Sequence, residues 1–354
     1  MKAVRYYGKG DVRFETDVPE PELLPGTIMI APAWTGLCGS DLHLYFEGPL
    51  VPVSPTADDA HRLTGEKLPV VLGHEFSGVV EQIGAGVTGF SIGDPVVVEP
   101  VKGCGSCAAC DSGRYNACGA MACLGISGGG GGLAEHVVVS PERVHHIGDM
   151  PLDEAALIEP LCVGYHAVKQ SGAKEGDIVV VAGAGPVGLL AAASLKGIGA
   201  TTIVSEVSPI RRQTAIDTGV ADYVVNPAAE SLADKVTDLT GGRGADVAVD
   251  CAGVQAALDE LLQVVKVGGV VEIVAMYNGK PEIDMAALVF KEITVQGSVG
   301  YADDHAAVIE LVRAGKIPLA PFITSRIRAE NFVEDGLKYL QAEKDTQVKM
   351  IVQL

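Results

Sequence analysis

The chain has 354 residues, of which 48% are hydrophobic and 20% charged, so it can bury enough apolar surface for more than one folded core. Its formal net charge of −19 at pH 7 argues against nucleic acid as a partner, because a polyanionic backbone would be repelled. No apolar run is long enough to span a bilayer, and residues 1–15 lack the apolar segment of a secretory signal. We therefore expect a cytoplasmic protein that does not bind membranes.

The first part of the chain, to about residue 150, carries short β-branched runs such as GTIMIAPAW and GDPVVVEP. Runs of this kind, separated by glycine, proline and aspartate, are typical of an all-β domain. From Ile178 the pattern changes, and short apolar strands, the last in ITVQGSV, are separated by helical stretches. This alternation predicts a doubly wound parallel sheet, so we expect an α/β protein with a Rossmann domain.

The residues after Gly300 read as a helix over 303–314, further helical pieces and a final strand, VKMIVQL. We expect this segment to return to the first domain. The predicted division is therefore a first domain over 1–157 and 300–354, and a second domain over 158–299.

Four of the eight cysteines share one turn-rich segment with the spacing C-x2-C-x2-C-x7-C, and they are Cys104, Cys107, Cys110 and Cys118. In a cytosolic protein such a cluster indicates a metal site rather than disulfides. Four thiolates close a tetrahedral shell, which predicts a structural zinc ion with no open position. An iron–sulfur cluster is the alternative, although nothing else in the sequence indicates electron transfer. We expect Cys123 and Cys251, which lie outside this spacing, to be small buried side chains.

Three further residues are candidate metal ligands: Cys38 in TGLCGSDLH, His74 in LGHEFSG and Glu159 in AALIEPLCVGYHAV. A lone cysteine or histidine is more often a buried side chain than a ligand. Glu159, however, stands in a largely apolar stretch, where a carboxylate is costly to bury unless positive charge lies beside it. A metal ion bound by these three residues is therefore our hypothesis.

A glycine loop follows the predicted strand Ile178–Ala182 and precedes a helical run. The loop consists of Gly183, Ala184, Gly185, Pro186, Val187 and Gly188. Its glycines permit the turn, let a pyrophosphate approach the backbone and let the helix pack on the sheet, while the helix N-terminus attracts the anion. Glu206, at the end of the next strand, is placed to bind the adenosine ribose hydroxyls. This combination predicts an NAD site.

With these motifs, the sequence resembles the zinc-containing medium-chain dehydrogenases over essentially its whole length. The resemblance implies a GroES-like fold for the all-β domain and a catalytic zinc ion bound by Cys38, His74 and Glu159, hence two zinc ions per subunit. It also brings Glu75, directly after the ligand histidine, into the catalytic site. This sequence departs from the ethanol-type branch of the family, which has a cysteine at the position of Glu159. In polyol-type relatives either Glu75 or Glu159 is the third protein ligand, so that choice stays open.

The same resemblance implies a proton relay and an adenine contact. Ser40 and His43 stand where the family keeps a hydroxyl and a histidine that carry the alcohol proton out of a closed pocket. The alternative is that both residues only cap the next helical turn. Arg211 is implied to lie over the adenine, and the alternative is an exposed charge on a helix.

Several segments, among them HRLTGEKLP, GISGGGGGLAEHVVV and VFKEITVQGSVGY, are similar to the 2,3-butanediol dehydrogenase branch. That similarity implies NAD-linked interconversion of 2,3-butanediol and acetoin, with zinc holding the substrate oxygen and a hydride passing to the nicotinamide. The alternatives are a sorbitol-like polyol or secondary-alcohol dehydrogenase and, in another class, a catalytically silent NAD- and zinc-binding protein. Relatives are dimers or tetramers, so we expect a homodimer or homotetramer that acts on a small alcohol or ketone.

Overall fold

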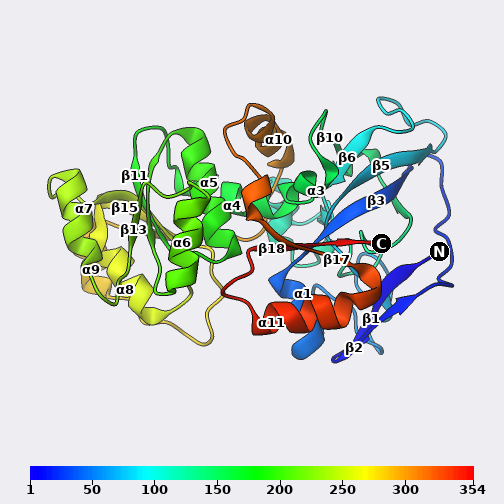
Figure 1. The fold of residues 1–354 in the computed structure, drawn as a ribbon, viewed down its shortest axis with the longest axis horizontal. Helices are drawn as coiled ribbons and strands as arrows, with labels where there is room; N and C mark the ends of the chain where they lie inside the picture. The colour runs from blue at the N-terminus through cyan, green and yellow to red at the C-terminus, as the bar shows by residue number, and fades with distance from the viewer. The chain divides into compact units, whose positions relative to one another are not determined.

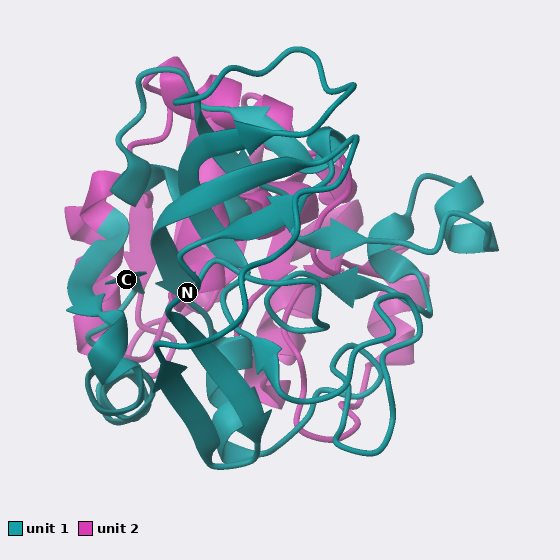
Figure 2. Ribbon diagram, turned by 90° about the vertical axis from the view of Figure 1, so that its right-hand side faces the viewer, with its two compact units in different colours: residues 1–159, 322–354 teal, residues 160–321 magenta.

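The computed structural model describes residues 1–354 and divides into two compact units (Figure 2). Unit 1 comprises residues 1–159 and 322–354, and unit 2 comprises residues 160–321. No helix is long and apolar enough to cross a membrane.

Unit 1 is built on a seven-stranded sheet of mainly antiparallel strands (Figure 1). The C-terminal strands, red in the figure, enter this sheet next to a strand from the start of the chain, because β18 pairs antiparallel with β3. The all-β prediction for this part of the chain is confirmed. In spatial order the strands are β10 (Val144–His146), β6 (Pro95–Val98), β5 (Glu75–Ile83), β3 (Ile28–Leu37), β18 (Lys349–Gln353) and β17 (Ile323–Arg328), with β9 (Val137–Val139) also on β3.

Smaller elements complete unit 1. A three-stranded sheet contains β2 (Asp11–Glu15), β1 (Ala3–Gly8) and β4 (Val70–Val71), and a two-stranded sheet contains β7 (Val101–Lys102) and β8 (Ala122–Cys123). The helical elements are α1 (Gly39–Phe46), α2 (Ala108–Asp111), η1 (Tyr115–Ala117), η2 (Pro141–Arg143), α3 (Leu152–Ala155), η4 (Ala329–Asn331), the π-helix η5 (Phe332–Lys338) and α11 (Tyr339–Ala342). Helix α4 (Ile158–Ser171) begins in unit 1 and continues in unit 2.

Two large hydrophobic clusters make up most of the core of unit 1. One joins Ile30 and Phe76 across the β3–β5 pair with valines of the neighbouring strands. The other joins Tyr6 on β1 to Phe332 on η5 and Met350 on β18, so the two ends of the chain share one core. Burial of these side chains fixes the strand register, because a one-residue slip would turn every apolar side chain to the opposite face.

Unit 2 is a six-stranded sheet in which every pairing is parallel, which confirms the predicted Rossmann-type domain. The order reverses beside β11, the usual location of a nucleotide site in such sheets. The strands in spatial order are β13 (Tyr223–Val225), β12 (Thr201–Ser205), β11 (Ile178–Ala182), β14 (Ala245–Asp250), β15 (Val265–Ile273) and β16 (Thr294–Gly297). The remaining helical elements are α5 (Pro186–Ile198), α6 (Pro209–Asp217), α7 (Leu232–Thr240), α8 (Gln255–Val264), α9 (Met285–Lys291), α10 (His305–Arg313) and η3 (Ala320–Phe322).

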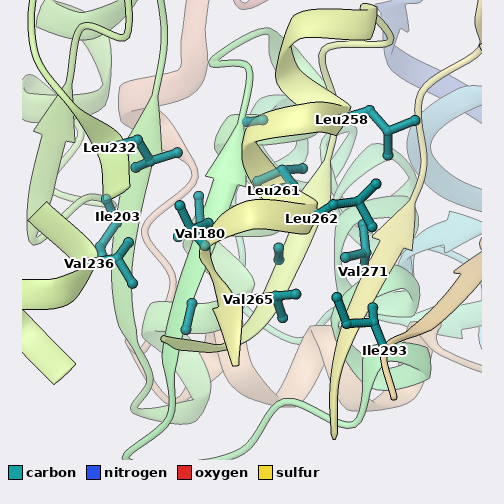
Figure 3. Close-up of a cluster of buried hydrophobic side chains, with 14 of the residues drawn as sticks. Val180, Ile203, Leu232, Val236, Leu258, Leu261, Leu262, Val265, Val271 and Ile293 are labelled. Atoms are coloured by element: carbon teal, nitrogen blue, oxygen red, sulfur yellow. The ribbon is translucent and has the colours of Figure 1, made fainter. Parts of the chain in front are cut away.

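The core of unit 2 lies between this sheet and its helices. Figure 3 shows Val180 of β11 and Val271 of β15 beside Leu261 and Leu262 of α8. Helix α5 combines strong helix formers with proline at its first turn and ends at Gly199, which has the left-handed φ of 87°. The sequence of α5 therefore fixes both ends of the helix that follows the glycine loop.

The return to unit 1 occurs later than the sequence prediction placed it. Residues 300–321 belong to unit 2, whereas the prediction had the return begin at residue 300. Asp304 ties this segment to α4, because its carboxylate accepts hydrogen bonds from His166 Nδ1 at 2.6 Å and Lys169 Nζ at 2.7 Å. The Ile317 side chain packs against Gly197 of α5. A Cβ added to Gly197 would lie 2.9 Å from that side chain, so the contact depends on the glycine.

Candidate metal centres and nucleotide site

The four cysteines of the C-x2-C-x2-C-x7-C segment lie around one point. Their sulfur atoms are within 4.8 Å of one another, and Cys107 Sγ is 3.7 Å from the sulfurs of both Cys110 and Cys118. A tetrahedron with zinc–sulfur bonds of about 2.3 Å has sulfur–sulfur edges of about 3.8 Å. The thiols are therefore already spaced for a zinc ion, and we call this segment, residues 104–118, the cysteine lobe.

Backbone amides of the cysteine lobe point at the sulfur atoms. The amides of Cys104 and Ala120 each donate to Cys118 Sγ at 3.4 Å, and the amide of Gly105 donates to Cys110 Sγ at 3.4 Å. Such donors stabilise thiolates and orient them toward a metal ion. No oxygen or nitrogen ligand joins this group, so the donor set suits a closed structural site.

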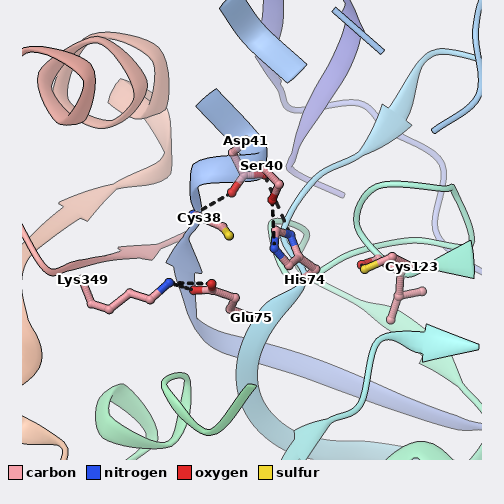
Figure 4. A network of polar contacts seen from close by, with 8 residues as sticks. Cys38, Ser40, Asp41, His74, Glu75, Cys123 and Lys349 are labelled. Carbon is pink, nitrogen blue, oxygen red and sulfur yellow. Dashed lines mark hydrogen bonds and ion pairs between the residues drawn. The ribbon is translucent and has the colours of Figure 1, made fainter. Parts of the chain in front are cut away.

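A second group of potential ligands lies elsewhere in unit 1. Cys38 follows β3 and is the N-cap residue of α1, while His74 and Glu75 stand at the start of β5 (Figure 4). One ligand atom of each residue lies within 4.8 Å of the others. The predicted meeting of Cys38 with His74 thus arises because β3 and β5 pair side by side. We call these three residues and Glu159, to which the sequence resemblance assigns the catalysis, the catalytic centre.

The catalytic centre favours positive charge. Burial lowers the pKa of His74, but its hydrogen bond with Cys38 and the negative charges of Asp41, Cys38 and Glu159 raise that pKa to about 10. His74 Nδ1 is also buried without a hydrogen-bond partner. A divalent cation would balance these anionic surroundings, so the donor set fits a zinc ion.

Glu159 is the second residue of α4 and is 8% exposed. Its carboxylate contributes to the negative charge at His74 and at Lys349, so it lies near the other ligands. It is not among the three ligand groups that lie within 4.8 Å of one another. Cys162, one turn further along α4, is fully buried, as a packing residue would be.

Asp41 supports the catalytic centre from helix α1. It is 2% exposed, its Oδ2 accepts a hydrogen bond from the Cys38 amide at 2.9 Å, and its Oδ1 lies 4.0 Å from His74 Nδ1. A carboxylate behind a histidine ligand orients the imidazole and raises its basicity. The sequence analysis missed Asp41, although an acidic residue three positions after an N-cap is a recognisable capping signal.

The two residues of the expected proton relay lie on the same short helix. Ser40 Oγ is 3.2 Å from His74 Nε2, which places the hydroxyl at the catalytic centre. The cap of α1 is made by Cys38 and Asp41, so capping does not account for Ser40. The side chain of His43 is 47% exposed, and its Nε2 lies 3.2 Å from Glu47 Oε2. His43 therefore faces solvent, where a proton could leave.

The glycine loop of unit 2 has the geometry that a nucleotide site requires. Gly183 has a φ of 93°, and Gly185 is the N-cap residue of α5, with Pro186 in the first turn and Val187 after it. A Cβ on Gly188 would lie 1.9 Å from the carbonyl oxygen of Gly183, so no other residue fits there. A cavity of about 290 Å³ borders Gly183 and is lined by Glu206 and Ala252 among others.

The Glu206 carboxylate is held in place by two backbone amides, those of Ala184 at 2.7 Å and Ser208 at 2.8 Å. Arg211 borders the loop, because a Cβ on Gly185 would lie 3.8 Å from its Nη1. Arg212 is engaged differently, since its guanidinium donates to the carbonyl oxygens of Glu206 and Val207.

The two cysteines outside the predicted metal sites differ in burial. Cys123 is buried, at 6% exposure, as expected for a small packing residue. Cys251 follows β14 behind the glycine loop and is partly exposed, so the prediction of a small buried side chain is wrong for it. A Cβ added to Gly188 would lie 3.3 Å from the Cβ of Cys251, so the glycine loop packs closely against this cysteine.

Comparison with known proteins agrees with the fold and identifies the family. Residues 24–149 match the alcohol dehydrogenase GroES-like domain, and residues 186–314 match the zinc-binding dehydrogenase domain. The chain belongs to the zinc-binding alcohol dehydrogenases. The predicted enzyme class, an NAD-dependent zinc alcohol dehydrogenase, is therefore confirmed.

Three comparisons narrow the likeness further. The (R,R)-butanediol dehydrogenase of Neisseria gonorrhoeae is 44% identical over 99% of both chains. That of Bacillus subtilis is 39% identical over 99% of both chains. The crystal structure of 2R,3R-butanediol dehydrogenase from Bacillus subtilis has a TM-score of 0.92 at 38% identity and covers 100% of this chain and 99% of its own.

Proposed function

We propose that the chain oxidises (R,R)-2,3-butanediol to acetoin with NAD, releasing NADH and one proton, and that it reduces acetoin in the reverse direction. The observation that carries the proposal is the full-length likeness to enzymes named for this substrate, at 44% and 39% identity. The fit of Cys38, His74 and a neighbouring carboxylate to a zinc ion supports the chemistry.

The residues of the catalytic centre take distinct roles in this proposal. Cys38, His74 and Glu159 hold the catalytic zinc ion, with Glu75 as the alternative third ligand. When bound, zinc acts as a Lewis acid on the substrate oxygen, and the nicotinamide accepts the hydride. Ser40 accepts the alcohol proton beside His74, and His43 passes a proton to solvent. The cysteine lobe holds the second zinc ion and takes no part in the reaction.

A panel of substrates tests the substrate assignment. NADH formation is measured with the butanediol isomers, 2-butanol, sorbitol and ethanol at matched enzyme concentration. The proposal expects the (R,R) diol to give the largest kcat/KM and 2-butanol a smaller one. Equal rates with sorbitol and butanediol would move the enzyme to the polyol alternative. No turnover of any alcohol by zinc-loaded protein would support the catalytically silent alternative.

NAD is preferred over NADP because of Glu206. In its present position the carboxylate would accept hydrogen bonds from the ribose hydroxyls but repel a 2′-phosphate in a partly desolvated crevice. Arg211 borders the site and would pair with a phosphate, whereas Arg212 is held by backbone carbonyls.

The Glu206→Ser variant tests this preference. We expect kcat/KM for NAD to fall and kcat/KM for NADP to rise, since Arg211 would then face the phosphate without a competing carboxylate. The Arg211→Ala variant in the same background should remove the gain with NADP. Equal efficiency of the wild type with both cofactors would contradict the preference.

The protein also forms a homodimer or homotetramer in this proposal, and unit 2 offers a surface for it. Strand β16 is an edge strand, and the adjacent helix α9 exposes Phe290 at 86% and Val289 at 68%. Exposed apolar groups beside an open sheet edge are typical of an interface between subunits. Sedimentation of the wild type and of Phe290→Glu tests this, with a shift toward monomer expected for the variant.

The absence of disulfides among the eight cysteines supports a cytoplasmic location.

A further inference from the structure

A buried ion pair lies at the edge of the catalytic centre. Lys349 Nζ is 2.5 Å from both carboxylate oxygens of Glu75, and the two side chains are 4% and 1% exposed (Figure 4). Burying two charges costs about as much as their attraction returns, so a pair of this kind is weak evidence for stability. A role at the neighbouring metal ligands is the more specific explanation.

The strands bring these two residues together across a glycine. Gly36 on β3 pairs with Glu75 on β5 on one side and with Ile351 on β18 on the other. A Cβ on Gly36 would lie 2.1 Å from Glu75 Oε2. Gly36 does not have a left-handed φ, so the backbone conformation does not require glycine there. Glycine is needed because a side chain would leave no room for the Glu75 carboxylate. The carboxylate of Glu75 therefore lies over Gly36 and reaches Lys349.

Glu75 is at the same time a potential metal ligand. One of its oxygens lies within 4.8 Å of ligand atoms of Cys38 and His74. Both oxygens contact the Lys349 ammonium, which competes with a metal ion for the same lone pairs. Glu159 supplies a second carboxylate near His74, although it is not among the three ligand groups that lie within 4.8 Å of one another.

We propose that Lys349 is a positioning residue that holds the Glu75 carboxylate over Gly36 in the ion pair and so leaves the third protein-ligand position on zinc to Glu159. The inference rests on the catalytic zinc site of the proposed function and deepens it. Without Lys349, the Glu75 carboxylate would be free to bind the ion as a further ligand in addition to Glu159.

The Lys349→Met variant tests this by removing the charge and keeping the length of the side chain. The protein is reconstituted with cobalt in place of the catalytic zinc, and its visible spectrum reports the number of ligands. We expect the bands to weaken, as they do when a four-coordinate ion gains a fifth ligand, and release of zinc to a chelator to slow by about tenfold. The matched control Lys280→Met changes an exposed lysine of unit 2 and should alter neither readout.

Two further variants separate positioning from stability. Lys349→Met with Glu75→Gln removes the freed carboxylate and should restore the wild-type cobalt spectrum. Gly36→Ala keeps both charges but fills the space under Glu75, and it should shift the spectrum in the same direction as Lys349→Met. Lys349→Arg keeps the charge and should keep the spectrum.

The outcomes distinguish this inference from the proposed function. An unchanged cobalt spectrum in Lys349→Met, with normal metal content, would overturn the positioning role even if the melting temperature falls. A wild type that binds no metal at the Cys38 site would overturn the zinc site and this inference with it. A wild type that binds zinc but fails to oxidise butanediol would leave the spectral test unaffected and refute only the substrate assignment.

Discussion

The two metal centres of unit 1 differ in how the chain builds them. The cysteine lobe takes all four ligands from residues 104–118, and each ligand is the same kind of thiolate. The candidate ligands of the catalytic centre come from the end of β3, the start of β5 and the first turn of α4, and they offer sulfur, nitrogen and oxygen donors. The lobe is partly exposed, whereas His74 and Glu75 are buried.

This difference shows what each site requires of the fold. A closed site needs only ligands at the right spacing, and backbone amides of the same segment stabilise them. An open site needs neighbours that leave one position free and control charge, and we propose Ser40, Asp41 and the Glu75–Lys349 pair for this role. Changes at the two centres should therefore affect different properties.

The largest expected effect follows loss of a catalytic ligand. Cys38→Ala should reduce kcat/KM for butanediol by about 10³-fold or more, because Lewis-acid stabilisation is worth several kcal/mol. The melting temperature should change little, since the lobe and both cores remain. The control is Cys162→Ala, a buried cysteine of α4 that should retain activity and zinc. Loss of both activity and zinc in the control would mean that Cys162 serves as a ligand of the ion.

At the cysteine lobe, we expect a substitution to lower stability and to leave activity unchanged. Cys107→Ser should lose the lobe zinc and lower the melting temperature by about 5–10 °C, because a structural zinc ion contributes directly to folding. The remaining folded protein should keep its kcat. Calorimetry and rates per active site measure the two effects, and Ser112→Ala, an exposed non-ligand of the lobe, is the control. A variant that keeps its stability and its full zinc content would show that the lobe is not a structural zinc site.

A smaller effect is expected at the edge of the catalytic centre. His43→Ala should leave zinc bound and slow turnover by about tenfold to a hundredfold, most strongly at lower pH, where an external base is scarce. Glu47→Ala breaks the contact at 3.2 Å but keeps the imidazole, so it should behave nearly as the wild type. The pH–rate profiles of the two variants are the measurement, and coincident profiles would take His43 out of the proton path.

The same division explains what the sequence could predict. The lobe spacing and the glycine loop are local patterns, and their geometry depends on nearby backbone, so the residues alone indicated both. The parallel sheet also followed from the alternation of strands and helices. The lobe and the loop depend on residues close in the sequence, and the sheet was recognised from its repeating order of strands and helices, although its strands pair over long separations.

Apart from the local contact of Asp41 with Cys38, the contacts that sequence reasoning missed join distant residues. Lys349 and Glu75 are brought together by β18, β3 and β5, and a lysine at the start of an apolar strand gave no sign of a buried partner. The late return to unit 1 depends on Asp304 meeting His166 and Lys169 on α4. Such pairings follow from the register of the sheet and the packing of helices, which local patterns do not specify.

The zinc content of the purified protein, measured for the wild type and Cys38→Ala together, tests most directly whether one chain holds two separate centres. The account predicts about two zinc ions per subunit in the active wild type and about one in the folded, inactive variant. One zinc ion per subunit in a fully active wild type, or two in the variant, would contradict it.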